Sequence, residues 1–242
     1  MEKQEKITVS MTRQEQFWGL CYLFFQALLL PSLLQAVLTI LYPNYDDVTL
    51  NLAFFAANFL AVSVIFLRFI KFSLEELPKK LWSCIWKAAL ALLVCKLAGQ
   101  LLNVLLHWLC PSYFEMTALG PVLRNPNDMH IAQMASQRFW LMALATVFLV
   151  PPVEELLHRG AVFGTLYAKN KVLAWLVSVI LFSGIHLLGY MGLGDPALLF
   201  LCFLQYLAPA IALCWLYQST GSLFAPILMH MAFNAIGILF VR

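Results

Sequence analysis

Residues 139–168 read FWLMALATVFLVPPVEELLHRGAVFGTLYA, an apolar run that contains two prolines, two glutamates, one histidine and one arginine. A helix needs about 20 apolar residues to cross a bilayer, and this run is longer. Pro151 and Pro152 cannot donate backbone hydrogen bonds, so we expect the helix to tilt or break there. The stretch therefore predicts a spanning helix that carries ionisable side chains into the bilayer.

The whole chain has the composition of a membrane protein. Apolar residues make up 62% of its 242 residues and charged residues only 11%, against roughly 25% charged residues in soluble domains. Helices are expected, because a spanning segment must satisfy its own backbone hydrogen bonds. Uniformly apolar runs such as Leu141–Val150 lack the alternation of a membrane barrel. The small net charge of +3 and the position of Lys and Arg beside the apolar runs argue against nucleic acid as a partner.

We predict an all-α, polytopic membrane helix bundle with about seven transmembrane helices. Residues 1–137 would hold an N-terminal tail, three helices and a long polar loop, 111–137, with a short interfacial helix. Residues 138–242 would form a four-helix catalytic core. Residues 71–80, KFSLEELPKK, are expected to connect two spans on the cytosolic side. The expected spans are 17–42, with a kink at Pro31, then 52–70, 81–110, 139–168, 172–188, 197–217 and 223–240.

Basic residues predict the orientation, because Lys and Arg accumulate in cytoplasmic loops. The turns 43–48 and 189–196 carry none, and the first apolar run is too long for a cleaved signal peptide. We expect an integral multi-pass protein of a bacterial plasma membrane, with its N-terminus in the cytoplasm and its C-terminus outside. Nine basic residues then fall on the cytoplasmic side: Lys3, Lys6, Arg13, Arg68, Lys71, Lys79, Lys80, Lys169 and Lys171.

Two neighbouring carboxylates stand out because the other ten acidic residues lie in the tail or in expected loops. A carboxylate among apolar residues is costly unless it is paired, protonated or facing water. Glu155 and Arg159 are four residues apart, so on a helix they share a face and can pair. Glu154 is rotated by about 100° and faces elsewhere, with His158 as its own neighbour. We predict a structural Glu155–Arg159 pair and a chemically active Glu154.

Two later spans carry polar side chains at helical spacing. Phe182 precedes His186 by four residues, and His230 precedes Asn234 by four. A carboxylate, two imidazoles and an amide that converge from three helices could activate a water and bind an oxyanion. Two histidines and Glu154 are equally a ligand set for hydrolytic zinc. Neither HExxH nor GxSxG occurs in the chain.

Three short motifs follow one another: EExxxR at Glu154, Glu155 and Arg159, FxxxH at Phe182 and His186, and HxxxN at His230 and Asn234. In this order they resemble the CPBP family of CAAX-protease and bacteriocin-processing membrane proteins, also called the Abi family, which includes the type II CAAX prenyl endopeptidases. The resemblance covers about residues 139–240. One departure is His158, where the family commonly has phenylalanine.

The resemblance implies an intramembrane endopeptidase that cleaves a membrane-associated peptide or protein, of the CAAX type or the bacteriocin-leader type. In such proteins the residues that match Glu154 and His186 activate the attacking water. Those that match His230 and Asn234 form the oxyanion site. The substrate would arrive from the membrane or its cytoplasmic face, and the lipid bilayer is the second partner.

The remaining motif residues, Glu155, Arg159 and Phe182, would support the site. Members of the family are often labelled metalloproteases, while other mechanisms favour a water activated by glutamate alone. The resemblance therefore leaves open whether zinc is a cofactor. If a metal is used, its ligands would be Glu154, His186 and His230.

Two other functions remain open at this point. A transporter or proton relay would also place Glu154, His186 and His230 within spans, although the chain has no obvious inverted repeat. A non-catalytic immunity scaffold would keep the same fold. We assign no role to Lys96 in the third expected span, and we expect His130 in the long loop to be solvated.

Overall fold

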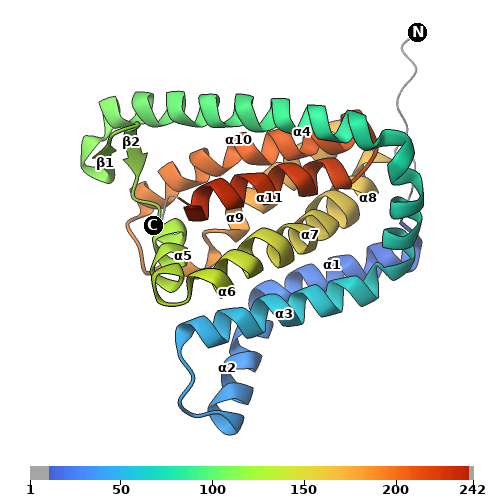
Figure 1. Ribbon diagram of the computed structural model, residues 1–242, viewed down its shortest axis with the longest axis horizontal. Coiled ribbons are helices and arrows are strands. Elements are labelled where there is room, and N and C mark those ends of the chain that lie inside the picture. The colour runs from blue at the N-terminus through green and yellow to red at the C-terminus, as the bar shows by residue number, and fades with distance from the viewer. Residues whose placement is uncertain (1–10, 240–242) are drawn as a thin grey trace.

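The computed structural model describes residues 11–239 (Figure 1). Of these residues, 84% are helical, and the helices pack as a bundle, as the sequence predicts. Lys3 and Lys6, which contribute to the predicted orientation, lie outside the described residues, as does Phe240 at the predicted end of the last span.

The first predicted span, 17–42, forms two helices. α1 (Arg13–Leu28) begins at a capping box formed by Thr12 and Glu15. α2 (Leu30–Leu41) follows after a bend of 57° and has Pro31 in its first turn. A proline has no backbone N–H and fits best at a helix start. The predicted kink is therefore a break between two helices.

The connection between the second and third predicted spans is also helical. α3 (Asp47–Ile65) starts at the cap residue Asp46, and α4 (Leu67–Leu109) follows after a single residue. α4 includes 71–80, so this connection is the first part of a long helix, and its cytosolic location stays a prediction. The segment is polar, but it is rich in Leu, Glu and Lys, which favour helix. Figure 1 shows the first turns of α4 rising beside the end of α3 before the helix runs along one edge of the molecule.

The long polar segment 111–137 is structured. It contains the predicted short helix and also an antiparallel hairpin, which departs from the all-α prediction. Gly120 has φ of 109° and closes the hairpin turn, a conformation that favours glycine. Its elements are η1 (Pro111–Tyr113), β1 (Phe114–Thr117), β2 (Gly120–Leu123) and α5 (Pro126–Gln137).

The fourth predicted span is one continuous helical stretch, Phe139–Tyr167. Pro151 and Pro152 lie in its middle, in a short α-helical part between two wider π-helical turns. Such turns absorb the lost backbone bonds and often occur at functional sites. The parts are α6 (Phe139–Leu144), η2 (Ala145–Leu149), α7 (Val150–Glu155), η3 (Leu156–Phe163) and α8 (Gly164–Tyr167).

The last third of the chain holds three longer helices and one short turn. Asn170 and Asp195 cap the starts of the first two, and Gly221 ends the second in the left-handed conformation. The first of the three is shorter than predicted, so His186 follows its last residue as the cap. The elements are α9 (Lys171–Ile185), η4 (Leu188–Tyr190), α10 (Pro196–Thr220) and α11 (Phe224–Leu239).

The largest buried cluster joins the N-terminal helices to the helices that carry the motifs. Phe66 after α3, Phe163 in η3 and Leu216 in α10 are all fully buried within it. Gly19 on α1 lies so close to Phe66 and Ala161 that a side chain there would clash. The core therefore holds η3, the segment with Arg159, against α1 and α10.

Much of the outer surface is apolar, as a lipid-facing surface requires. In α3 and α4, only 17% of the most apolar window is buried within the protein. Within the described residues, four helical stretches are long and apolar enough to span a membrane, or five if α1 and α2 form one broken span. α9 and α11 are shorter, with 15 and 16 residues. The chain is thus a multi-pass membrane protein, and the number of seven spans stays a prediction.

The segments predicted to be cytoplasmic gather at one end of the bundle (Figure 1). There Arg68 bonds Glu15 at 3.3 Å, and Lys80 and Lys87 donate to the carbonyls of Thr220 and Ser219. The shared location agrees with the predicted topology. Which side of the membrane this end faces stays a prediction, as do the bacterial plasma membrane and the division at residue 138.

Candidate active site

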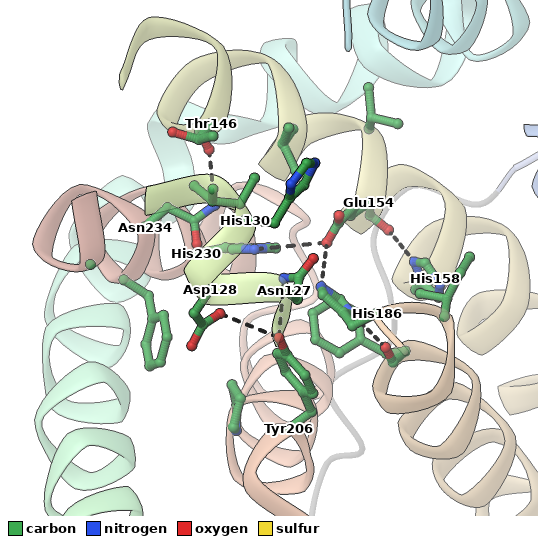
Figure 2. A pocket seen from close by; sticks show the side chains of 18 of the residues that line it. Asn127, Asp128, His130, Thr146, Glu154, His158, His186, Tyr206, His230 and Asn234 are labelled. Atoms are coloured by element: carbon green, nitrogen blue, oxygen red, sulfur yellow. Dashed lines mark hydrogen bonds and ion pairs between the residues drawn. The ribbon is translucent and has the colours of Figure 1, made fainter. Parts of the chain in front are cut away.

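A cavity of about 1090 Å³ lies among α3, α4, α5, α7 and α11 and reaches the bend between α1 and α2. All four residues predicted to be catalytic line it: Glu154, His186, His230 and Asn234 (Figure 2). They come from α7, the end of α9, and α11. The structure therefore brings together the three motifs that the sequence placed on separate helices.

Glu154 is the centre of this group. Its Oε2 lies 3.7 Å from Nε2 of His186 and 3.8 Å from Nε2 of His230. These distances are too long for direct hydrogen bonds. Oε2 is nevertheless buried and has no hydrogen-bond partner among the described residues. A water between the carboxylate and the two rings would satisfy it, because a site with several polar partners holds water readily.

The contacts of Nδ1 in His186 and His230 determine which ring nitrogen carries the hydrogen. Nδ1 of His186 lies 2.7 Å from the backbone carbonyl of Phe182, and Nδ1 of His230 lies 2.9 Å from Oε1 of Glu155. A carbonyl or a carboxylate only accepts, so both Nδ1 atoms donate. In the neutral rings, both Nε2 atoms then present lone pairs towards Glu154. Oε2 of Glu154 and the two Nε2 atoms are then three hydrogen-bond acceptors that face one another. A water or an added proton must supply the hydrogens for hydrogen bonds among them.

Asn234 is held by one of the π-helical turns. Its amide Nδ2 donates to the carbonyl of Thr146 at 2.9 Å (Figure 2). An amide nitrogen has two hydrogens, so the second stays available to the cavity. The widened turn at Ala145–Leu149 thus orients a donor beside His230, one helical turn away on α11.

Glu155 and Arg159 form the predicted ion pair, with both side chains fully buried. Their atoms Oε1 and Nη1 are 3.3 Å apart, and Nη2 of Arg159 donates to the carbonyl of Ala210 at 3.1 Å. The guanidinium also lies 4.1 Å from the centre of the Phe182 ring. Glu155 therefore links the arginine to His230, and it supports the site without facing the cavity.

Phe182 packs the site, as the sequence predicts. Its ring is 4.7 Å from the ring of His186 and 5.9 Å from that of His230. The same ring meets His158 edge-on at 5.4 Å. His158 is buried, and its Nδ1 contacts the carbonyl of Glu154. It therefore neither points to solvent nor meets the Glu154 carboxylate directly.

One polar group at the site was missed by sequence reasoning. Tyr206 on α10 stacks on His186, with ring centres 4.6 Å apart. Its hydroxyl accepts from Asn125 and Asn127 and lies 3.4 Å from Asp128. Asp128 is open to the cavity but otherwise enclosed by protein, and this enclosure raises the pKa of its carboxyl.

Asn127 and Asp128 come from α5, inside the segment predicted to be a polar loop. His130 of the same helix also lines the cavity and is partly exposed (Figure 2). No spacing rule links residues of a loop to a helix about 60 to 80 positions later. A histidine and an aspartate two residues apart were the only available hint.

The predicted metal ligands Glu154, His186 and His230 converge, with Oε2 of Glu154 3.7 and 3.8 Å from the Nε2 atoms of the two rings. Ligands at about 2.1 Å from a tetrahedral zinc ion lie roughly 3.4 Å apart, so these side chains would have to move only slightly to hold one. Among residues 11–239, no group of three or more His, Cys, Asp or Glu side chains is already arranged to hold a metal ion. Zinc as a cofactor stays a prediction.

Comparisons with known proteins identify the relatives of this chain. It is 30% identical to an uncharacterized 24.3 kDa protein of Escherichia coli, in an alignment that covers 59% of this chain and 67% of that protein. No solved structure matches. Residues 136–236, which contain all three motifs, match the family described as type II CAAX prenyl endopeptidase Rce1-like. The chain therefore belongs to this family of membrane endopeptidases.

Proposed function

We propose that the protein is an intramembrane endopeptidase that hydrolyses a peptide bond with a water held between Glu154 and His186. The observation that carries this proposal is the buried, unpartnered Oε2 of Glu154, which lies 3.7 and 3.8 Å from two imidazole nitrogens without a hydrogen bond to either. In the proposed reaction the water donates to His186 Nε2 and to the Glu154 carboxylate. The carboxylate then takes a proton as the oxygen attacks the peptide carbonyl.

The oxyanion that forms needs donors, and the proposal assigns Asn234 and His230 to this role. The free amide hydrogen of Asn234 is one donor. His230 can donate from Nε2 only as an imidazolium, because its Nδ1 already donates to Glu155. With Glu154 and Glu155 ionised and Arg159 positive, the cluster carries one net negative charge, which a proton on His230 neutralises. Glu154 finally returns its proton to the leaving amine.

The proposed substrate is a membrane-associated peptide or protein, consistent with the CAAX type or the bacteriocin-leader type. The cavity supports this choice, because it extends from Glu154 to Pro31 and Ser32 at the α1–α2 bend. Large apolar side chains such as Ile40 and Leu41 are exposed on α2. A substrate tethered to the bilayer could therefore enter from the lipid side.

Hydrolysis by water can be tested directly. Purified protein in detergent micelles is incubated with a library of lipid-modified and unmodified peptides, and the products are read by mass spectrometry. In H₂¹⁸O, we expect one ¹⁸O atom in the new carboxylate after a single turnover, because the attacking oxygen comes from water. Absence of any cleavage across the library by folded protein would reject the proposed function.

The same assay tests the metal-free form of the mechanism. After dialysis against a chelator, we expect kcat/KM to stay within about twofold, since the chemistry is assigned to side chains. Added zinc should then give no recovery, because there is no loss to restore. A loss on chelation that zinc reverses would contradict this part of the proposal and leave the peptidase assignment intact.

Asn234 separates a peptidase from a proton relay. Asn234→Ala should lower kcat about 10²- to 10³-fold with little change in KM, because one oxyanion donor is lost. Asn51→Ala is the matched control, since Asn51 lines the same cavity but bonds only the Asp47 carbonyl of its own helix. A relay would tolerate the loss of Asn234, so equal activity of both variants would contradict the assigned role.

A further inference from the structure

Lys96 has an unusual position in α4. It lies in a span and lines the cavity, and among the described residues it is the sole Lys or Arg that does so. Its Nζ is 3.6 Å from the ring centre of Phe233 on α11. Phe233 follows His230 by three residues and directly precedes Asn234. The ammonium therefore contacts a residue that lies within one helical turn of the proposed oxyanion donors on α11.

The protein gives this ammonium little compensation. Within the described residues Lys96 makes no hydrogen bond or ion pair, and its Nζ lies over the Phe233 ring. Asp128 is near enough to interact electrostatically but forms no ion pair with it. A lysine inside a span is costly without a partner, which marks it as a functional position.

The neighbouring positions on α4 point to a peptide as the partner. Lys96, Gln100 and Asn103 are spaced by four and three residues, so they share one helical face, and all three line the cavity. Oδ1 of Asn103 is buried and has no hydrogen-bond partner among the described residues. It can accept a backbone N–H from an extended chain. The rise of about 10 Å from Lys96 to Asn103 matches about three extended residues.

We propose that Lys96 determines specificity by binding a carboxylate of the peptide substrate close to the scissile bond. This inference rests on the proposed function, because it assigns a subsite to that reaction. The carboxylate can be the C-terminus of the substrate or an Asp or Glu side chain. Lys96 takes no part in the bond-breaking step, and it positions the peptide across Glu154.

The test uses three versions of one peptide that the wild-type protein cleaves and that lacks other acidic residues. The first has a free C-terminal carboxylate, the second has a C-terminal amide, and the third has the amide and one added Glu. We expect kcat/KM to be about 10- to 100-fold higher for a carboxylate peptide than for the neutral amide, as for a charge-assisted hydrogen bond. Whichever carboxylate peptide is preferred identifies the source of the charge.

The variants assign this preference to Lys96. Lys96→Met should lose the preference and cleave the carboxylate peptides and the neutral amide at equal rates, and thermal unfolding in detergent reports that it folds. Lys96→Arg should keep most of the preference, because the charge is retained. Lys87→Met is the matched control, since Lys87 lies on the same helix but donates to the Ser219 carbonyl and does not line the cavity. It should keep the full preference.

The two proposals fail in different ways. If the wild-type protein cleaves all three peptides equally, or if Lys96→Met keeps the preference, the Lys96 inference is overturned while the peptidase stands. If the wild-type protein cleaves no peptide at all, the proposed function falls and the inference falls with it.

Discussion

Replacing Glu154 by glutamine should lower kcat by about 10²- to 10⁴-fold, the range that a positioned general base contributes. Glutamine has the same shape as glutamate, so the packing around α7 and the KM for a peptide should change little. It cannot take a proton from water, however. Its amide nitrogen also donates hydrogen bonds where the carboxylate only accepts them, so the proposed water would be held in a different orientation.

Single-turnover cleavage of the preferred peptide measures this effect, and thermal unfolding in detergent checks the fold. Glu115→Gln is the control, because Glu115 is an exposed glutamate on the hairpin strand β1 and lies outside the cavity. It should retain wild-type activity. Retention of more than about a tenth of the activity by Glu154→Gln would exclude Glu154 as the general base.

The sequence was most informative where helical spacing acts within one segment. The four-residue spacing of Glu155 and Arg159 predicted a pair that is present and fully buried. The same helical period placed Glu154 on a different face of the helix from Glu155, and in the structure Glu154 lines the cavity. These predictions succeed because they depend only on the period of the helix.

Polarity was a poor guide to where helices end. The polar stretch 71–80 continues α4, and Pro31 divides a predicted span into two helices. Residues 111–137 form a hairpin and a helix, and the helix contributes to the cavity wall. Hydropathy reports the environment of a segment and not its backbone conformation. A polar helix that extends beyond the bilayer is therefore predicted as a loop.

Contacts between helices could not be derived from spacing at all. The bond from Asn234 to Thr146 depends on a π-helical turn, and the stacking of Tyr206 on His186 depends on how α10 packs. Lys96 was given no role, although a lysine in the middle of a span is itself a recognised indicator of function. The motifs were found by looking for polar residues three or four positions apart. The same test applied to α4 would have found the face that carries Lys96, Gln100 and Asn103.

Removing one partner of the Glu155–Arg159 pair should have the largest effect on stability. Arg159→Met leaves a buried carboxylate whose remaining partner is His230, and we expect a loss of about 3–5 kcal/mol in the free energy of unfolding. The guanidinium contacts with Phe182 and the Ala210 carbonyl are lost as well. Equilibrium unfolding in mixed micelles measures this change.

An exposed pair provides the control for this loss. Glu76 and Lys79 are three residues apart on α4, at 2.7 Å, with side chains that are 33% and 69% exposed. Lys79→Met should change the free energy of unfolding by less than about 1 kcal/mol, since solvent screens the pair. If Arg159→Met were no more destabilising than Lys79→Met, the buried pair would not be holding η3 in place.

The double variant Glu155→Leu with Arg159→Met separates stability from chemistry. It leaves no unpaired buried charge, so most of the lost stability should return, as it does when a buried ion pair is replaced by apolar residues. Peptidase activity should stay low, because His230 loses the acceptor that fixes its Nδ1 hydrogen and favours its protonated form. A stable double variant with wild-type activity would show that Glu155 serves the fold alone, and that His230 acts without its support.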